Sequence, residues 1–332
     1  MDEDLPGRPH AGSAGSVVLV TGAAGFIGSH LAERLTGEGH VVRVVDCLTP
    51  YYDVSLKRAA LDRLRELGCI VSEDDLRSCD INALLQDVDV VYHQAGQPGV
   101  RASWELFESY MGHNILATQR LLEAVAGSEV RRVVFASSSS IYGNAESYPT
   151  SEDDPPRPIS PYGVTKLAAE RLCSVYAEGW GVSAVSLRYF TVFGPRQRPD
   201  LAVHRLIDAA LTGRPFPLYG DGSQIRDFTY VDDIVEANLL AAAADVASGT
   251  VLNVAGGTAA SVLDVVRIVE DLMGRPVPLE RQPTERGDVE RTGGSTERAA
   301  RLLGWAPKVS LEEGVSRQVA WQRERAALSA SR

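Results

Sequence analysis

The fold of this chain is decided by one short stretch, VVLVTGAAGFIG, at residues Val17–Gly28. Its apolar first part, which ends at Thr21, predicts a buried strand, and a helical pattern begins at Phe26. The turn between them has the spacing G-x-x-G-x-x-G, in which glycine permits a tight bend and lets the backbone approach a ligand. The N-terminus of the following helix offers free N–H groups and a positive dipole end to phosphates. We therefore expect a dinucleotide site made by Gly22, Gly25, Phe26, Ile27 and Gly28.

Strand-like and helix-like segments alternate outward from this stretch. Continuous apolar runs, typical of strands buried on both faces of a parallel sheet, lie at Val17–Thr21, Val41–Asp46, Val88–His93, Arg132–Ser137 and Ala184–Arg188. Helical patterns lie between them at Phe26–Thr36, Leu56–Leu67, Trp104–Ala126 and Pro161–Glu178. The alternation predicts an α/β fold with a Rossmann-like, doubly wound parallel sheet.

Acidic and small residues near the ends of the next strands fit the same ligand. Asp46 ends the second strand, where a carboxylate binds a ribose 2′-hydroxyl and repels a 2′-phosphate, so NAD is favoured over NADP. Asp75 and Leu76 follow the third strand and are expected to hold the adenine. Ala95 and Gly96 follow the fourth strand, where small residues let the cofactor lie against the backbone.

The pattern becomes irregular after Phe193. Helical segments recur at Asp232–Ala244, Ser261–Met273, Thr296–Leu303 and Leu311–Ala327. They indicate a smaller, mixed α/β C-terminal lobe on the carboxyl edge of the sheet, where the substrate would bind. We expect a disordered tail over residues 1–15, an NAD-binding Rossmann domain over 16–190, and the lobe mainly over 191–330, with a return to the sheet near 225–255.

Composition excludes several classes of protein. The chain has 33 basic and 44 acidic side chains and a net charge of −11, which argues against a general nucleic-acid binder. No apolar run approaches the roughly 18 residues of a membrane span, and the first residues lack the apolar core of a signal peptide. The four cysteines show no C-x-x-C spacing and the six histidines no zinc spacing. We expect a reduced, cytoplasmic protein without a metal.

A tyrosine and a lysine open the fourth helical segment. Tyr162 and Lys166 are separated by four residues, so they share one helix face. A nearby ammonium favours the phenolate and lowers a tyrosine pKa from about 10, which would let Tyr162 act as a general acid or base. Four serines, Ser137–Ser140, stand at the carboxyl end of the fifth strand. Ligands bind at that edge of a doubly wound sheet.

These motifs and three later ones together resemble the extended short-chain dehydrogenase/reductase family, specifically its NAD-dependent nucleotide-sugar epimerases and dehydratases. The later motifs are Leu187–Phe190, Arg226–Asp233 and Asn253-Val254, and the resemblance covers about residues 16–325. It implies that Ser138 hydrogen-bonds the reacting sugar oxygen and that Tyr162 and Lys166 are catalytic and border the cofactor. Asn114 matches the family's structural asparagine beside the cofactor. The resemblance also implies that Trp104–Ala126 and Pro161–Glu178 pair in a four-helix dimer interface.

The residues after Ser138 separate the members of this family. Dehydratases carry Asp-Glu there and decarboxylases carry Glu at the second position, whereas this chain has Ser139 and Ser140. Two segments, Tyr51–Arg58 and Phe190–Pro195 followed by Arg198-Pro199-Asp200, are similar to nucleotide-glucuronate 4-epimerases. Thr191 replaces the asparagine usual in glucose 4-epimerases. Hydroxyls at Ser139, Ser140 and Thr191 would surround a C6 carboxylate with neutral hydrogen bonds, or would line a pocket for any hexose.

Arginines are expected to hold the diphosphate, since a guanidinium binds phosphate oxygens in a bidentate manner. Arg226 matches the family's phosphate-binding arginine. Arg286 and Asp288 match a C-terminal Arg-x-Asp that grips phosphate and ribose. Arg101 and Arg196 lie in expected pocket loops.

The resulting hypothesis is NAD-dependent C4 epimerisation of a UDP-sugar by a homodimer, most simply UDP-glucuronate to UDP-galacturonate through a transient 4-keto intermediate. UDP-glucose 4-epimerase stays open as an alternative. UDP-glucuronate decarboxylase and dTDP-glucose 4,6-dehydratase are disfavoured by Ser139 and Ser140. A non-catalytic NAD-binding sensor is disfavoured by the intact Ser138, Tyr162 and Lys166 set, and a 4-ketoreductase that consumes NADPH is disfavoured by Asp46.

Overall fold

The computed structural model describes residues 15–284 and 287–330. The predicted disordered tail therefore lies outside the described residues, apart from Gly15. Within the described ranges no helix is long and apolar enough to cross a membrane.

A parallel sheet of seven strands forms the centre of the described chain, in the order β10-β6-β5-β4-β1-β2-β3. The strands are β1 Val17–Thr21, β2 Val41–Val45, β3 Ile70–Ser72, β4 Val90–His93, β5 Arg132–Ser138, β6 Ala184–Tyr189 and β10 Thr250–Val254. The order reverses between β1 and β4, which is the switch point where doubly wound sheets bind ligands. The predicted Rossmann-like fold is confirmed, and β10 joins β6 after the chain has passed through the first part of the lobe.

Alternate side chains of each strand serve two hydrophobic layers. Val18 and Val20 pack with helices α1 Phe26–Gly37, α2 Val54–Glu66, α8 Val231–Ala243 and α10 Glu297–Leu303. Leu19 packs on the opposite face, with α3 Ile81–Leu85, α5 Ala117–Ala126 and α6 Pro161–Trp180. Helix α6 begins where the Ser160 hydroxyl accepts a hydrogen bond from the Gly163 N–H, one residue before Pro161. This cap fixes the turn that carries Tyr162.

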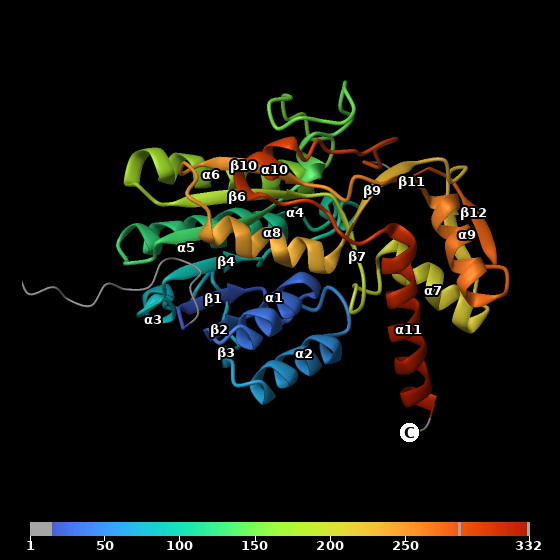
Figure 1. Cartoon of the computed structure of the whole chain (residues 1–332), viewed down its shortest axis with the longest axis horizontal. Coiled ribbons are helices and arrows are strands. Elements are labelled where there is room, and N and C mark those ends of the chain that lie inside the picture. The colour runs from blue at the N-terminus through green and yellow to red at the C-terminus, as the bar shows by residue number, and fades with distance from the viewer. Residues whose placement is uncertain (1–14, 285–286, 331–332) are drawn as a thin grey trace, which may run out of the picture.

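The C-terminal lobe grows from the carboxyl edge of the sheet, because β7 (Thr191–Phe193) follows β6 after one residue (Figure 1). Strands β11 (Ala259–Ser261), β9 (Ile225–Tyr230) and β7 form a small mixed sheet, and β12 (Leu279–Gln282) pairs with β8 (Phe216–Tyr219). Helices α7 (Ala202–Thr212), α9 (Val262–Met273) and α11 (Leu311–Ala330) pack around the rings of Phe193, Phe228 and Tyr230. The lobe thus has its own core beside the main sheet.

The helix predicted over Trp104–Ala126 begins at Phe107 and is not α-helical throughout. A 3₁₀ turn at Ala102–Trp104 (η1) is followed by α4 (Phe107–Tyr110), a π-helical segment at Met111–Leu116 (η2) and α5. A π turn inserts one residue into the helix and often marks a functional site. Here it contains Asn114, whose carbonyl accepts a hydrogen bond from the Thr118 hydroxyl. The sequence analysis also missed α3 and α7, although Val203, Leu206, Ile207 and Ala210 form a regular buried face.

Candidate active site

The turn between β1 and α1 tolerates only glycine at two of its positions. Gly22 has φ +68°, and a Cβ there would lie 2.7 Å from the Ala95 Cα atom. A Cβ at Gly28 would lie 2.3 Å from the Gly22 carbonyl oxygen. Gly25 occupies the N-cap of α1, and among the described residues no side chain caps that helix. The first N–H groups of α1 are therefore left for an anionic ligand, and the loop is narrow enough for a pyrophosphate to approach the backbone.

A cavity at the carboxyl edge of β1, β2 and β4 contains nearly all the predicted cofactor residues. Its lining includes Gly22, Gly25, Phe26, Ile27, Gly28, Asp46, Asp75, Leu76, Ala95, Gly96, Tyr162 and Lys166. The Asp46 carboxylate accepts hydrogen bonds from the N–H groups of Ala24 (3.1 Å) and Leu48 (2.8 Å). Burial raises the pKa of Asp46, while these hydrogen bonds and Lys57 act in the opposite direction. The donors, the shape and the carboxylate all fit a dinucleotide.

Asn114 lies behind the wall of this cavity. Its Oδ1 accepts a hydrogen bond from the Gln97 N–H (2.6 Å), and its Nδ2 donates to the Gln97 carbonyl (3.1 Å) and to Thr165 Oγ1 (2.9 Å). A Cβ at Gly96 would lie 3.0 Å from Asn114 Oδ1, so the two are in close contact. Asn114 therefore supports the loop that borders the cofactor site.

A second cavity adjoins the first, and Tyr162 lines both. The predicted substrate residues Ser138, Ser139, Ser140, Thr191, Arg226 and Asp288 line this second cavity. They come from the end of β5, from β7 and β9, and from the segment after β12. The lobe and the sheet therefore each supply one side of a substrate site, with Tyr162 at the junction.

The electrostatics around Tyr162 differ from the sequence-based prediction. Burial raises the pKa of Tyr162, and both the contact with the Ser138 side chain and the charge of Arg198 act to lower it. The lysine lies deeper, with its Nζ 4.6 Å from the centre of the Phe135 ring. Burial lowers the pKa of Lys166 to about 8, opposed by Cys173 and Glu170. The charge of Arg198 thus acts to lower the pKa of this half-buried tyrosine.

Arg198 was missed as a site residue by the sequence analysis. It lines both cavities, and its Nε and Nη2 atoms bind the Asp200 carboxylate at 2.9 Å each. Burial lowers the pKa of Arg198, but Asp200 outweighs it and the net shift is upward. The spacing Arg-Pro-Asp was a usable signal, because a carboxylate two residues away can orient a guanidinium toward a neighbouring cavity.

Arg196 does not lie where the sequence analysis placed it. It is not among the described residues that line either cavity. It has φ +64° and reaches α1, with Nη1 2.7 Å from Glu33 Oε1 and Nε 3.2 Å from His30 Nε2. The left-handed backbone turns its side chain toward α1, which is the physical reason for the correction.

Of the remaining predicted arginines, Arg226 and Arg101 are among the described residues. Arg226 lines it, and burial lowers the pKa of this guanidinium while Asp288 acts to raise it. Arg101 is absent from the described lining of both cavities, but it lies 3.1 Å from the lining residue Asp288, and its guanidinium carbon lies 3.8 Å from the centre of the Tyr219 ring. Arg286 lies outside the described residues.

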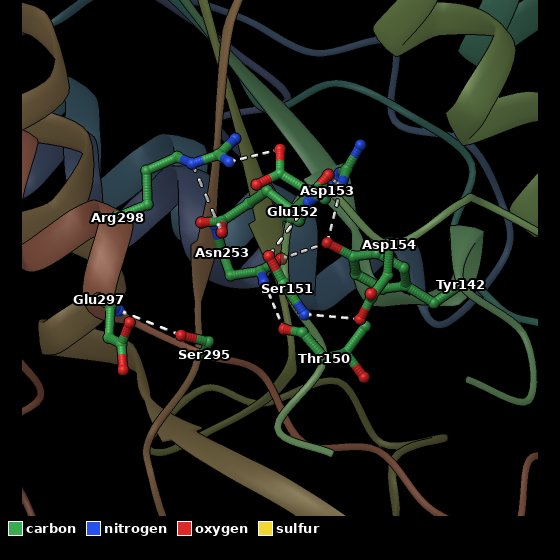
Figure 2. A network of polar contacts seen from close by, with 11 residues as sticks. Tyr142, Thr150, Ser151, Glu152, Asp153, Asp154, Asn253, Ser295, Glu297 and Arg298 are labelled. Atoms are coloured by element: carbon green, nitrogen blue, oxygen red, sulfur yellow. Dashed lines mark hydrogen bonds and ion pairs between the residues drawn. The ribbon is translucent and has the colours of Figure 1, made fainter. Parts of the chain in front are cut away.

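The segment that carries Asp288 is tied to the sheet by a polar network (Figure 2). Backbone hydrogen bonds join Thr150 to Gly293 (2.7 Å) and Ser295 (2.9 Å). In Figure 2 Arg298 reaches both Glu152 and Asp153, at 3.7 and 2.6 Å. Glu152 in turn accepts a hydrogen bond from the N–H of Asn253 in β10 (2.8 Å). The outer wall of the substrate cavity is therefore fixed to an edge strand of the main sheet.

One group of possible metal ligands occurs among the described residues. Single ligand atoms of Cys47, Asp75 and His113 lie within 4.8 Å of one another. All three line the first cavity, and both Asp75 oxygens are already bound by Arg77. The group therefore belongs to the lining of the first cavity rather than to a separate site.

Comparison with known proteins identifies relatives that match this chain over most of its length. Residues 18–255 match the model described as NAD dependent epimerase/dehydratase family. The chain is 42% identical to an uncharacterised UDP-glucose epimerase of Bacillus subtilis, over 92% of this chain and 97% of the relative. It is 38% identical to a probable UDP-glucuronate 4-epimerase of Rhizobium meliloti, over 91% and 96%. The crystal structure of the UDP-glucuronic acid 4-epimerase of Bacillus cereus with UDP-glucuronic acid and NAD is 40% identical, with a TM-score of 0.90 and coverage of 93% and 99%.

Proposed function

This chain belongs to the NAD-dependent epimerase/dehydratase family, and we propose that it catalyses the C4 epimerisation of a UDP-sugar, foremost the interconversion of UDP-glucuronate and UDP-galacturonate. One observation carries the proposal. Tyr162 stands at the junction of the cofactor and substrate cavities, with Ser138 beside it and the neutral hydroxyls of Ser139, Ser140 and Thr191 around the substrate side. Relatives named for this activity support it.

Two side chains act directly on the C4 hydroxyl of the sugar. Tyr162 accepts the proton of the C4 hydroxyl, and Ser138 hydrogen-bonds the same oxygen. NAD, when bound in the first cavity, would supply the hydride acceptor and donor for C4. Lys166 lies on the cofactor side of Tyr162, and Gly22, Gly25 and Asp46 hold the pyrophosphate and ribose. Arg226 would bind the nucleotide diphosphate and Asp288 its ribose, so the 4-keto sugar can rotate about the diphosphate.

The substrate site must also prevent loss of the carboxyl group. A 4-keto glucuronate is a β-keto acid, which loses CO₂ when the bond to its carboxylate is aligned with the carbonyl π system. The Ser139, Ser140 and Thr191 hydroxyls and the Arg198 guanidinium can hold the carboxylate out of that alignment. Asp288, the acidic side chain among the described residues of this cavity, is bound by Arg101 and lies near the rim. Among its described residues, the site therefore has no carboxyl group that is suitably placed for an elimination reaction.

A product analysis tests the proposal. Purified protein is incubated separately with UDP-glucuronate and UDP-glucose, and the products are followed by ¹H NMR. We expect UDP-galacturonate from the first substrate and a slower reaction or none with the second. A dominant UDP-pentose would identify a decarboxylase, and faster turnover of UDP-glucose would favour the glucose epimerase. Bound NAD without turnover of either substrate would favour the sensor.

We propose further that the protein is a cytoplasmic homodimer. Exposed apolar side chains gather on two helices that pack against each other: Leu106, Phe107, Met111 and Leu116 on the α4–η2 segment and its flanks, and Val164 and Val175 on α6. A second copy that presents the same face would bury them in a symmetric interface. Sedimentation velocity tests this: a Val175→Glu variant should shift from dimer to monomer, whereas Val41→Glu, at an exposed position on β2, should not.

A further inference from the structure

A line of buried hydrogen bonds runs from the glycine-rich loop to the π turn. The Ala95 N–H donates to Thr21 Oγ1 (3.1 Å), and Thr21 Oγ1 lies 2.8 Å from His93 Nδ1. His93 Nε2 lies 2.9 Å from Thr118 Oγ1, which donates to the Asn114 carbonyl (2.7 Å). These side chains are almost completely buried, with exposed fractions of 0–1%. Thr21, His93 and Thr118 have no role in the proposed mechanism.

The direction of every bond in the line is determined. Since the Thr118 hydroxyl donates to a carbonyl, its oxygen accepts a hydrogen bond from His93 Nε2–H. The Nδ1 of a neutral imidazole then accepts from the Thr21 hydroxyl, whose oxygen accepts from the Ala95 N–H. Burial and the charge of Lys166 lower the pKa of His93 to about 3, so the ring stays neutral. Each donor thus has one acceptor, and the line couples the loop after β4 to η2.

The far end of the line sets the orientation of Asn114. A π turn is a less favourable arrangement than the α-helix on either side of it, so it persists where specific contacts hold it. Thr118 supplies such a contact at the Asn114 carbonyl. The Asn114 amide then reaches Thr165 Oγ1, and the Thr165 hydroxyl donates to the Tyr162 carbonyl (2.8 Å). The chain of contacts ends on the turn of α6 that carries Tyr162.

We propose that His93 and Thr118 are positioning residues for proton transfer at Tyr162, because they hold the π turn in the register that directs Asn114 toward Gln97 and Thr165. The proposal rests on the proposed function. Loss of the Thr118 hydroxyl removes the contact at the Asn114 carbonyl and lets η2 relax toward α-helical register. Asn114 then turns away from Thr165, and both the Gly96–Gln97 wall and the first turn of α6 lose a fixed partner.

The test uses the isosteric pair Thr118→Val and Thr118→Ser, since valine keeps the size of threonine and serine keeps its hydroxyl. We expect Thr118→Val to lower kcat with UDP-glucuronate about ten-fold or more, because small displacements of catalytic groups are costly. KM and the amount of retained NAD should change less than about two-fold, and Thr118→Ser should recover most of kcat. A kcat of Thr118→Val close to wild type, or equal losses in both variants, would overturn the proposal.

A second measurement does not depend on turnover. Hydrogen–deuterium exchange of the amides in residues 111–118 should accelerate in Thr118→Val and stay near wild type in Thr118→Ser. Unchanged exchange in Thr118→Val would refute the link to the π turn even if the wild-type protein failed to epimerise any sugar. If Thr118→Val does not fold, His93→Gln and His93→Asn replace it, because glutamine can still reach Thr118 with an amide N–H and asparagine is too short. Equal kcat in those two variants would also overturn the proposal.

Discussion

Two buried polar networks hold opposite sides of the active site, and they use different chemistry. The network behind Tyr162 is made of neutral groups: three threonine hydroxyls, the imidazole of His93 and the amide of Asn114. The network on the other side contains charges and joins segments distant in sequence. Its centre is the ion pair between Arg188 of β6 and Glu170 of α6, and its outer part is drawn in Figure 2.

The charged network is the more deeply cross-linked of the two. Arg188 binds both Glu170 oxygens, at 3.0 and 2.7 Å, with side chains only 4% and 1% exposed. Its Nη1 also donates to the Tyr142 hydroxyl (2.6 Å) and the Glu152 carbonyl (3.2 Å). Tyr142 donates to Asn253 Oδ1 (2.7 Å), which continues the network to β10.

Because of this difference, the neutral network mainly orients side chains, whereas the charged network mainly affects the stability of the fold. Neutral hydrogen bonds contribute modestly to folding but are directional, so they suit side chains whose orientation matters. A buried charge is expensive when its partner is removed, so a charged network fails through unfolding. We therefore expect changes on the neutral side to affect mainly turnover and changes on the charged side to affect mainly the free energy of unfolding.

The largest effect is expected on the catalytic side. Tyr162→Phe removes the proton acceptor and should lower kcat by roughly 10²–10⁴-fold, the range typical of a general acid or base. Binding of UDP-glucuronate, measured by calorimetry, should be retained. The matched control is Tyr142→Phe, which removes a hydroxyl from the charged network and should turn over at a rate near wild type. Near-wild-type turnover by Tyr162→Phe would refute the catalytic assignment.

Removal of one charge tests the other side. Arg188→Met leaves Glu170 buried without its cation and should lower the free energy of unfolding by about 3–5 kcal/mol in urea denaturation. The double variant Arg188→Met/Glu170→Met should recover much of that loss, because both charges are gone. If the double variant is no more stable than the single one, the buried charge is not the cause of the loss.

A smaller, pH-dependent effect is expected at Asp227 in β9. Burial raises the pKa of this carboxyl to about 6, and its Oδ1 has no hydrogen-bond partner among the described residues. Because the folded protein binds this proton more tightly than the unfolded chain, the contribution of Asp227 falls as pH rises from about 4 to 6. Asp227→Asn should therefore gain about 3 kcal/mol in unfolding free energy relative to wild type at pH 7.5, and little at pH 4. An equal difference at both pH values would contradict this explanation.

The smallest effect is expected at the exposed edge of the charged network. The Arg298 side chain is 25% exposed and its closer partner, Asp153, is 80% exposed. Arg298→Ala should cost no more than about 1 kcal/mol of unfolding free energy, as for other ion pairs near solvent. Arg267→Ala, which breaks an exposed pair with Asp264, serves as the control. A loss as large as that of Arg188→Met would show that the contribution of these ion pairs to the free energy of unfolding does not depend on their burial.

Much of the site could be predicted because its signals are local. The spacing of Gly22, Gly25 and Gly28 predicts a single turn, and the spacing of Tyr162 and Lys166 places both on one face of a single helix. The substrate residues Ser138, Ser139, Ser140 and Thr191 follow directly from the carboxyl ends of β5 and β6, where ligands of such sheets bind. The lobe was harder to predict, since its strands β7, β8, β9, β11 and β12 are short and pair out of chain order.

The sequence by itself determined the parallel sheet, the dinucleotide turn and the Tyr162 helix, because each depends on residues within a few positions of one another. Only the tertiary structure showed that Arg198 faces the two cavities while Arg196 turns to Glu33. Arg196 has a left-handed backbone, and each guanidinium is directed by the carboxylate that it binds. It also decided that a predicted straight helix contains a π turn. That turn depends on His93, a residue on β4 whose contact with Thr118 exists only in the folded chain.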